Sequence, residues 1–271
     1  MPLKIKNKDD GKEKRKIKNR TEEARMNKIK MNKINLSDLN LKMLKTHCGI
    51  IMPRLGDTDL RNQLQHLKTD IGDIYPPSGD AMRHWQFLNL NPDRVFSLAG
   101  TYSEVQLKEN VILPMLTLAG QILPPFSADR CSEYPISHKD DRIHLEGVAD
   151  LVYGRPPDEL GELLRDPFLC VHEYKREKNP VEIFDAMAQL LGGMWILLRK
   201  NQDAGHRHPI YGLMVKGQTW RFAELHPNGK DNTCRAVFDA DGFFIKSDIN
   251  SIFRALRHYF LLAGEILKKS G

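Results

Sequence analysis

The chain has 271 residues, 41 Lys and Arg against 35 Asp and Glu, and a formal net charge of +6. This length allows one large domain or two small ones, and a hydrophobic fraction of 41% excludes a wholly disordered chain. The four cysteines form no Cys-x-x-Cys pair, which argues against a structural zinc site and against a disulfide scaffold.

The positive charge is concentrated in the first 35 residues, which hold 13 Lys and Arg and 5 Asp and Glu. The remaining residues hold 28 Lys and Arg and 30 Asp and Glu, so the body of the protein is close to neutral. We interpret residues 1–35 as a basic disordered tail. Its densest part, residues 14–20, is a nuclear import signal, a phosphate-binding arm or a solvated extension with no specific role.

Hydropathy along the chain predicts no membrane partner. The N-terminus has no apolar stretch of the kind that a secretory signal needs. The longest apolar stretch, residues 186–198, is too short to span a bilayer, which takes about 20 residues. We therefore expect an intracellular protein, nuclear if the basic tail is an import signal and cytoplasmic otherwise.

Residues 36–98 are predicted to form a helical lead-in without a core of its own. Ser37 is a predicted N-cap for a helix that ends near His47, and a second helix is expected over residues 58–70. A third short helix or turn is expected over residues 84–90, between breaks rich in proline.

Residues 99–271 are predicted to form one α/β domain. Helical spacing over residues 103–119 predicts a helix that Pro114 kinks. The elements expected after it are strands at 134–137, 143–153 and 168–174, a buried helix at 181–199, a hairpin of 210–215 and 219–225, a strand pair within 236–246, and a helix capped by Ser247 or Asp248 that reaches Lys268. This order predicts a mixed sheet with helices on its faces.

Two of these strands carry charged residues at positions where a buried strand rarely has them. Asp150 lies within one strand, and Glu173 and Lys175 lie two apart at the end of the next, so the latter two share a face. If the strands are neighbours, Asp150 lies beside Glu173, and two such carboxylates repel each other unless a cation lies between them. Oxygen ligands of this kind suit Mg²⁺ or Mn²⁺, and a nearby lysine suits hydrolysis of a phosphodiester. The alternative is an ion-pair network at a sheet edge.

The residues Gly147-Val148-Ala149-Asp150, followed by Glu173-Tyr174-Lys175, resemble the signature of the PD-(D/E)XK nuclease superfamily of restriction-endonuclease-like proteins. Glu104, in the first turn of the preceding helix, matches the acidic helix position of the superfamily, and Gln189 matches the polar position on the following helix. The chain departs from the pattern in having Ala149 before Asp150 and Gly193 where RecB-type members carry Tyr. The resemblance therefore assigns no subfamily.

The resemblance implies a restriction-endonuclease-like core with a central mixed sheet of four or five strands flanked by helices. It implies a Mg²⁺- or Mn²⁺-dependent endonuclease that acts on nucleic acid, DNA rather than RNA, as a homodimer or part of a larger assembly. Asp150, Glu173 and the Tyr174 carbonyl would bind the metal, and Glu104 would hold a second metal ion or a water. Lys175 would position the attacking water and stabilise the phosphate, and Gln189 would orient Lys175 or the substrate.

Other candidate residues have simpler interpretations. His172 alternates to the face opposite Glu173, where packing is the expected role. The residues His206-Arg207-His208 are expected in a solvated loop, and Arg176 and Lys178 are either phosphate contacts or exposed loop charges. Gly192 and Gly193 are expected to allow close packing of their helix on the sheet. A second function remains open: a nuclease-like fold that is catalytically silent and binds nucleic acid or assembles with partners.

Overall fold

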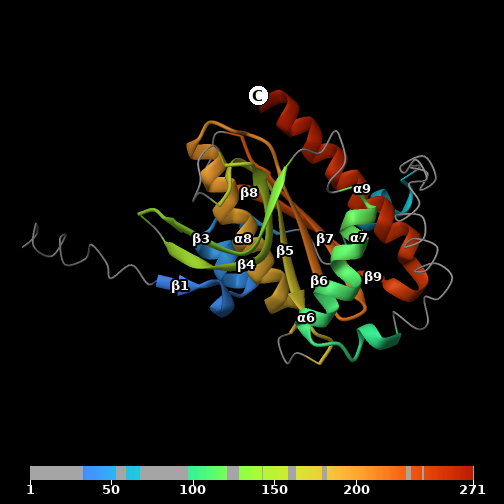
Figure 1. The fold of residues 1–271 in the computed structure, drawn as a ribbon. Coiled ribbons are helices and arrows are strands. Elements are labelled where there is room, and N and C mark those ends of the chain that lie inside the picture. Colours follow the sequence, from blue (N-terminus) through green and yellow to red (C-terminus); the bar gives the residue numbers. More distant parts are fainter. Residues whose placement is uncertain are drawn as a thin grey trace, which may run out of the picture.

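The computed structural model describes residues 33–52, 59–67, 97–120, 128–141, 143–157, 163–178, 182–229, 233–239 and 241–270. Within these ranges the chain forms a mixed sheet with helices on both faces, so the protein has the predicted α/β class (Figure 1). No helix in the described ranges is long and apolar enough to cross a membrane.

In the part of the chain that the structure describes, the sheet has nine strands, which follow the order β1-β4-β5-β6-β7-β8-β2, with β3 paired to β4 and β9 paired to β7. The strands are β1 (Lys33–Asn35), β2 (Ile50–Ile51), β3 (Asp129–Lys139), β4 (His144–Arg155), β5 (Arg165–Lys175), β6 (Ile210–Lys216), β7 (Thr219–Pro227), β8 (Cys234–Phe238) and β9 (Phe243–Phe244). The β1–β4, β5–β6 and β2–β8 pairs are parallel, and the other pairs are antiparallel.

The predicted count of four or five strands is wrong. That count came from the resemblance, whereas the hydropathy pattern itself predicted seven strands. The two that it missed are β1 and β2, which come from the N-terminal part of the chain and are only three and two residues long. A run that short shows no alternation of apolar and polar residues, so its sequence carries no strand signal. The predicted strand pair within 236–246 also differs, because β8 and β9 each pair with β7 and not with one another.

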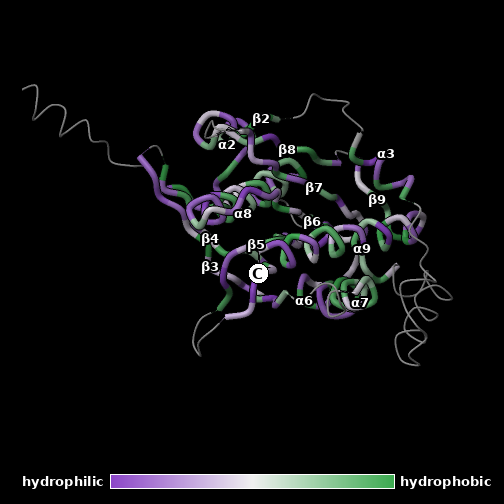
Figure 2. The backbone as a smooth tube through the Cα atoms, turned by 90° about the horizontal axis from the view of Figure 1, so that it is seen from above, coloured by the Kyte–Doolittle hydropathy of each residue, from purple (hydrophilic) through white to green (hydrophobic). Residues whose placement is uncertain are grey.

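Helices cover both faces of the sheet, with β5 between α8 and α9 (Figure 2). One core contains side chains of α8 and of the N-terminal η1 and α2, and the other contains side chains of the α6–α7 region, α3 and α9. The helical elements are η1 (Leu36–Asp38), α2 (Leu41–His47), α3 (Asp59–Gln65), α6 (Glu104–Leu107), η2 (Lys108–Ile112), α7 (Leu113–Leu118), α8 (Ile183–Asp203) and α9 (Ile245–Ser270).

The two glycines in the middle of α8 explain how closely this helix packs. A Cβ atom at Gly192 would lie 2.4 Å from the Leu39 Cδ1 atom, and one at Gly193 would lie 3.3 Å from Ile136 of β3 and from Val171 of β5. A side chain at Gly193 would crowd the sheet, which confirms the predicted role of this glycine in packing the helix on it. Gly192 instead makes room for Leu36 and Leu39 of the N-terminal segment.

Several local predictions need correction. Asn40, not Ser37, caps α2, because its Oδ1 atom accepts a hydrogen bond from the Met43 N–H at 3.0 Å. Pro114 lies just after η2, a π-helical turn that separates α6 from α7, so the irregularity begins before the proline. The predicted helix or turn at 84–90 and the tail residues 1–32 lie outside the described residues, whereas Lys33–Asn35 belong to the sheet.

Candidate active site

Strands β4 and β5 are paired along part of their length and then separate. Their pairing runs through Tyr153↔Cys170 and Leu151↔His172 and ends there. Strand β3 covers one edge of β4 along its length, so β1, which pairs with residues 144–146 of β4, lies on the same edge as β5. Between these two pairings the edge of β4 has no strand partner among the described residues, and this gap between β1 and the end of β5, hereafter the fork, contains Asp150.

The fork holds a pocket with a volume of about 350 Å³, hereafter the fork pocket. It brings together four residues that the sequence singled out, since Asp150, Glu173, Lys175 and Gln189 all line it. The other lining residues are Asn35, Leu36, Ser37, Glu133, Gly147 and Val148.

A side chain replaces the missing backbone pairing at the fork. The Tyr174 N–H donates a hydrogen bond to the Asp150 Oδ2 atom at 2.5 Å, where a β4 carbonyl would otherwise accept it. The ring of Tyr174 lies on the opposite face of β5, where its hydroxyl is 2.8 Å from the His172 Nδ1 atom. His172 is buried against Tyr153 and Tyr174, as the prediction of a packing role requires.

The face on which Asp150 lies depends on an irregularity in β3 and β4. Ala149 packs in the core on the α8 side, and Leu151, two residues later, packs in the core on the other side, so the alternation changes phase between them. At this point Glu133 of β3 has a left-handed φ of 52°, and the Glu133–Asp150 pair is missing from the otherwise continuous register. The phase change puts Asp150 on the same face as Glu173.

Among the charged groups of the fork pocket, Glu173 is buried, and Asp150 and Lys175 are partly buried. The Lys175 Nζ atom forms an ion pair with the Glu173 Oε1 atom, and the two side chains are 14% and 8% exposed. Burial, followed by the charge of Asp150, raises the pKa of Glu173 to about 8 despite the lysine. Burial also raises the pKa of Asp150 to about 6, against the opposing effects of the Tyr174 hydrogen bond and of Lys175.

The lysine keeps its proton in this environment. Burial by itself lowers the pKa of Lys175, but the charge and hydrogen bond of Glu173, together with Asp150 and Glu104, raise it above its usual value. An ammonium group at this position can orient a water or stabilise negative charge, and it cannot act as a general base.

Glu104 lies near the fork pocket without lining it. It begins α6, where the Ser103 Oγ atom accepts a hydrogen bond from the Gln106 N–H and the Gln106 side chain accepts one from the Ser103 N–H. The charge of Glu104 raises the pKa of both Asp150 and Glu173, which means that the three carboxylates share one electrostatic environment.

Gln189 reaches the fork pocket from α8. Its residue surface is only 9% exposed, and among the described residues its carboxamide has no hydrogen-bond partner. Its polar atoms are not among the fully buried, unpartnered atoms of the described residues, so the amide faces the open space of the pocket, where water or a ligand can bond to it.

Three further residues of the fork pocket were not predicted. Asn35 and Ser37 come from the N-terminal segment that was assigned to the tail and the lead-in, and Glu133 was given no role. Glu133 is exposed, and its Oε1 atom lies 3.6 Å from the Lys108 Nζ atom. The only signal that distinguishes Glu133 is its left-handed φ, which a sequence does not reveal because glycine or asparagine is the usual residue there.

The remaining candidates lie elsewhere. Arg176 and Lys178 are exposed beyond the end of β5. The His206 Nε2 atom lies 2.9 Å from the Asp166 Oδ2 atom, and His208 lies close to His206, at the other end of the strand. Across the described ranges, no group of three or more His, Cys, Asp or Glu side chains is placed to hold a metal ion.

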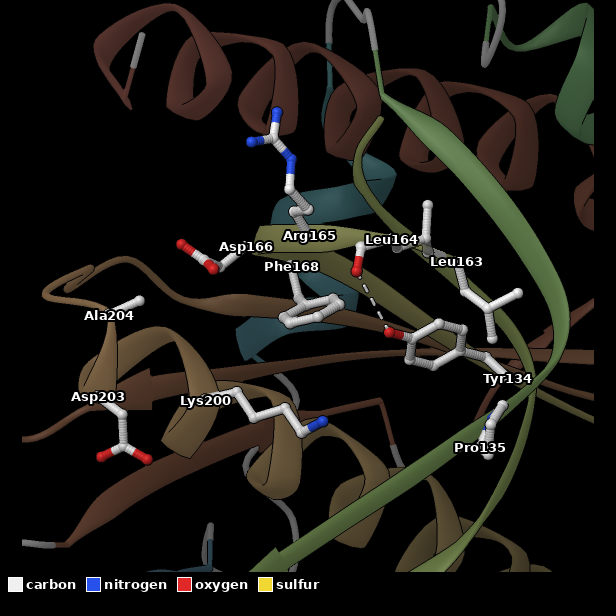
Figure 3. Close-up of a pocket in the computed structure, with 10 residues that line it drawn as sticks. All are labelled: Tyr134, Pro135, Leu163, Leu164, Arg165, Asp166, Phe168, Lys200, Asp203 and Ala204. Atoms are coloured by element: carbon white, nitrogen blue, oxygen red, sulfur yellow. Dashed lines mark hydrogen bonds between the residues drawn. The ribbon is translucent and has the colours of Figure 1, made fainter. Parts of the chain in front are cut away.

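A larger pocket, with a volume of about 780 Å³, lies at the start of β5 and is hereafter the edge pocket (Figure 3). Several of its polar groups are engaged within the protein. The Tyr134 hydroxyl points to the Leu164 carbonyl, Arg165 donates to the Pro156 carbonyl, and Lys200 lies over the Phe168 ring. Asp166, which also lines it, has a side chain that is 44% exposed.

Comparison with protein-family models gives no match, and no curated protein is significantly similar to the chain.

Proposed function

We propose that this chain is a metal-dependent endonuclease that hydrolyses phosphodiester bonds of DNA, with a restriction-endonuclease-like core formed by α6–α7, β3–β6 and α8. The observation that carries the proposal is the convergence of Asp150, Glu173, Lys175 and Gln189 in one pocket, from two strands and a helix. Burial of three charges inside apolar strands is costly, and such clusters with shifted pKa values are typical of functional sites.

The residues of the fork pocket fit a bound Mg²⁺ or Mn²⁺ ion. Glu173 is buried and Asp150 is partly buried, and burial is the main reason that the pKa of each is raised. The charge of Asp150 adds to the shift of Glu173, and a bound cation would offset both effects. Proteins hold Mg²⁺ with only one or two carboxylates, together with waters and substrate phosphates, so a cluster of three side chains is not needed. Asp150, Glu173 and the Tyr174 carbonyl would hold the ion, with Glu104 nearby. When bound, it would neutralise charge on the phosphate and make water more acidic.

The chain's own groups have distinct roles in this proposal. Hydrolysis adds a hydroxyl to phosphorus and a proton to the leaving oxygen, and negative charge accumulates on the phosphate on the way. The Lys175 ammonium stabilises that charge and orients the attacking water. Gln189 offers its unpaired amide to Lys175 or to a phosphate oxygen, and the Tyr174 N–H fixes the position of the Asp150 carboxylate.

The direct test is cleavage of plasmid and single-stranded DNA with Mg²⁺ or Mn²⁺ by the wild type and by Lys175→Ala. We expect the wild type to cut both in a metal-dependent manner and Lys175→Ala to lose about 10²–10³-fold in rate, the cost of removing one charge-stabilising group. The matched control is Lys200→Ala, which changes a lysine of α8 that lines the edge pocket at the start of β5. Its cleavage rate should stay within about twofold of wild type. Metal-dependent cleavage that survives Lys175→Ala would refute the assignment.

One observation favours a second function, a catalytically silent module that binds nucleic acid or assembles with partners. The body of the protein is close to neutral, whereas a nuclease often presents a basic groove. This alternative predicts DNA binding without turnover, at a level that is the same with and without divalent metal.

A further inference from the structure

One wall of the fork pocket comes from the first residues that the structure describes. Asn35, Leu36 and Ser37, at the junction of β1 and η1, all line it. Strand β1 pairs in parallel with β4 and places Asn35 opposite Glu146. The Lys33 Nζ atom forms an ion pair with the Glu146 Oε1 atom at 2.6 Å. This segment is therefore attached to the sheet directly beside the pocket.

Two glycines leave room for the Leu36 side chain, which is buried in the core on the α8 side of the sheet. A Cβ atom at Gly147 of β4 or at Gly192 of α8 would lie 2.8 Å from this side chain. Contacts that short do not occur in packed interiors, so a larger residue at either position would displace Leu36. Leu39 is buried in the same core. Burial of the two leucines fixes the position of this wall of the pocket.

The polar side chains of the wall are available to a ligand. Asn35 and Ser37 are exposed and line the pocket. The Asn35 side chain does not cap η1, and it has no other hydrogen-bond partner among the described residues. The Ser37 Oγ atom makes only a long hydrogen bond, of 3.4 Å, to the Asp38 Oδ1 atom. Both side chains can donate to a phosphate oxygen, and amides and hydroxyls supply many of the contacts between proteins and nucleic-acid backbones.

Neutral donors suit a pocket with this set of charges. The fork pocket is lined by the carboxylates of Asp150, Glu173 and Glu133 and by one ammonium group, that of Lys175. A cationic side chain in such a pocket pairs with a carboxylate, as Lys175 does with Glu173. A carboxamide or a hydroxyl has no charge to be paired in this way, so its donor stays available for a phosphate oxygen.

The neutral donors lie apart from the charged groups along β4. Asn35 is opposite Glu146, four residues before Asp150, which separates the two backbone positions by about 13 Å at about 3.3 Å per residue. A substrate whose reacting phosphate lies at Asp150 and Lys175 would therefore meet Asn35 and Ser37 at another part of its backbone.

We propose that Asn35 and Ser37, hereafter the neutral rim, bind the nucleic-acid backbone next to the phosphate that reacts at Lys175. This inference rests on the proposed function and adds two substrate-binding residues that lie outside the resemblance to the nuclease signature. Binding by uncharged donors also fits a protein body that is close to neutral.

The test compares two double variants of the full chain. The rim variant is Asn35→Ala with Ser37→Ala. The matched control is Asn250→Ala with Ser251→Ala, which removes the same two side chains from α9, away from the fork pocket. Neither variant changes the formal charge, so the long-range attraction of DNA is the same for both.

The first readout is the Kd for a fluorescent DNA oligonucleotide in EDTA, as a single strand and as a duplex, measured by anisotropy at several salt concentrations. We expect the rim variant to bind about tenfold more weakly than wild type, because two hydrogen bonds are lost. The dependence of log K on log salt should stay the same, because neither side chain neutralises a phosphate. The control variant should stay within about twofold of wild type. Equal Kd values for the rim and control variants would overturn the proposal, and so would a wild type that does not bind DNA.

The second readout is cleavage, which separates this inference from the proposed function. With an active wild type, the rim variant should raise KM in parallel with Kd and keep kcat within about twofold, because the neutral rim does not contact the reacting phosphate. A fall in kcat at unchanged KM would overturn the proposal. A wild type that binds DNA without metal-dependent cleavage would refute the nuclease function, and the neutral rim would then be judged by Kd alone.

Discussion

The two ends of β5 carry pockets that differ in a way that size does not reveal. The edge pocket at the start of the strand has more than twice the volume of the fork pocket at its end. The Asp166 side chain of the edge pocket is 44% exposed, whereas the Glu173 side chain of the fork pocket is 8% exposed. Water hydrates the Asp166 carboxylate at the start of β5. The Glu173 carboxylate at the end of β5 has lost most of its hydration, which makes its negative charge unfavourable.

This difference indicates where chemistry is expected. A large open pocket in which several polar groups already have protein partners offers a ligand little that water does not. The fork pocket is small and holds two carboxylates, a lysine and an amide. When both carboxylates are charged they repel each other, and a bound cation would lower this repulsion while the lysine and the amide bind a phosphate. The following changes test that contrast, from the largest expected effect to the smallest.

Neutral replacements of carboxylates at the two ends should differ most in cleavage rate. Asp150→Asn and Glu173→Gln are each expected to lower the rate by about 10²–10³-fold or more, because each removes charge from the site where the metal and phosphate meet. Asp166→Asn and Asp203→Asn, which line the edge pocket, are expected to stay within about twofold. Equal losses at both ends, measured under single-turnover conditions, would remove the distinction between the pockets.

The buried charge of Glu173 should appear as a pH-dependent loss of stability in the metal-free protein. Its pKa is about 8 when folded against an ordinary 4.5, so the folded state holds the extra proton between these values. Stability from this group is therefore complete below pH 4.5 and is lost as the pH rises through 8. At pH 9, Glu173→Gln should be more stable than wild type by on the order of 1–3 kcal/mol in denaturant titrations. A destabilised variant at pH 9 would contradict the shifted pKa.

His172, on the opposite face of β5, should affect stability at acid pH. Burial lowers its pKa to about 3 from an ordinary 6.5. Between pH 3 and pH 6.5, His172 is therefore protonated in the unfolded state and neutral in the folded state. Stability falls as the pH drops through this window, by up to about 1.4 kcal/mol per pH unit from this group. His172→Gln should therefore flatten the acid dependence of the free energy of unfolding, and an unchanged slope would mean that His172 protonates in the folded protein.

The left-handed backbone of Glu133 should give the smallest effect. Glycine adopts a φ of 52° without strain, so Glu133→Gly is expected to raise the free energy of unfolding by about 0.5–1 kcal/mol. Ser132→Gly, at the neighbouring exposed position, should lower it by a similar amount. Destabilisation of both variants in the same denaturant titration would show that Glu133 is not strained.

The sequence predicted the fold where its signals were long. The helix predicted at 181–199 is α8, whose 21 residues give a long apolar pattern. The predicted hairpin is β6 and β7, which flank a clear turn. Alternation placed Glu173 and Lys175 on one face of β5, whereas the position of Asp150 beside them depends on the change of phase between Ala149 and Leu151, which the sequence does not show. The sequence could not show β1, which is too short to have a pattern, or the backbone of Glu133, whose conformation is set by the tertiary structure.

Calorimetric titration of the metal-free protein with Mn²⁺ tests the central claim most directly, because binding does not depend on a correct choice of substrate. We predict that the wild type and Asp166→Asn bind Mn²⁺ alike and that Asp150→Asn and Glu173→Gln lose the binding. Absence of binding in the wild type, or binding that persists in both fork-pocket variants, would contradict the proposal that the fork of β4 and β5 is a metal-dependent hydrolytic site.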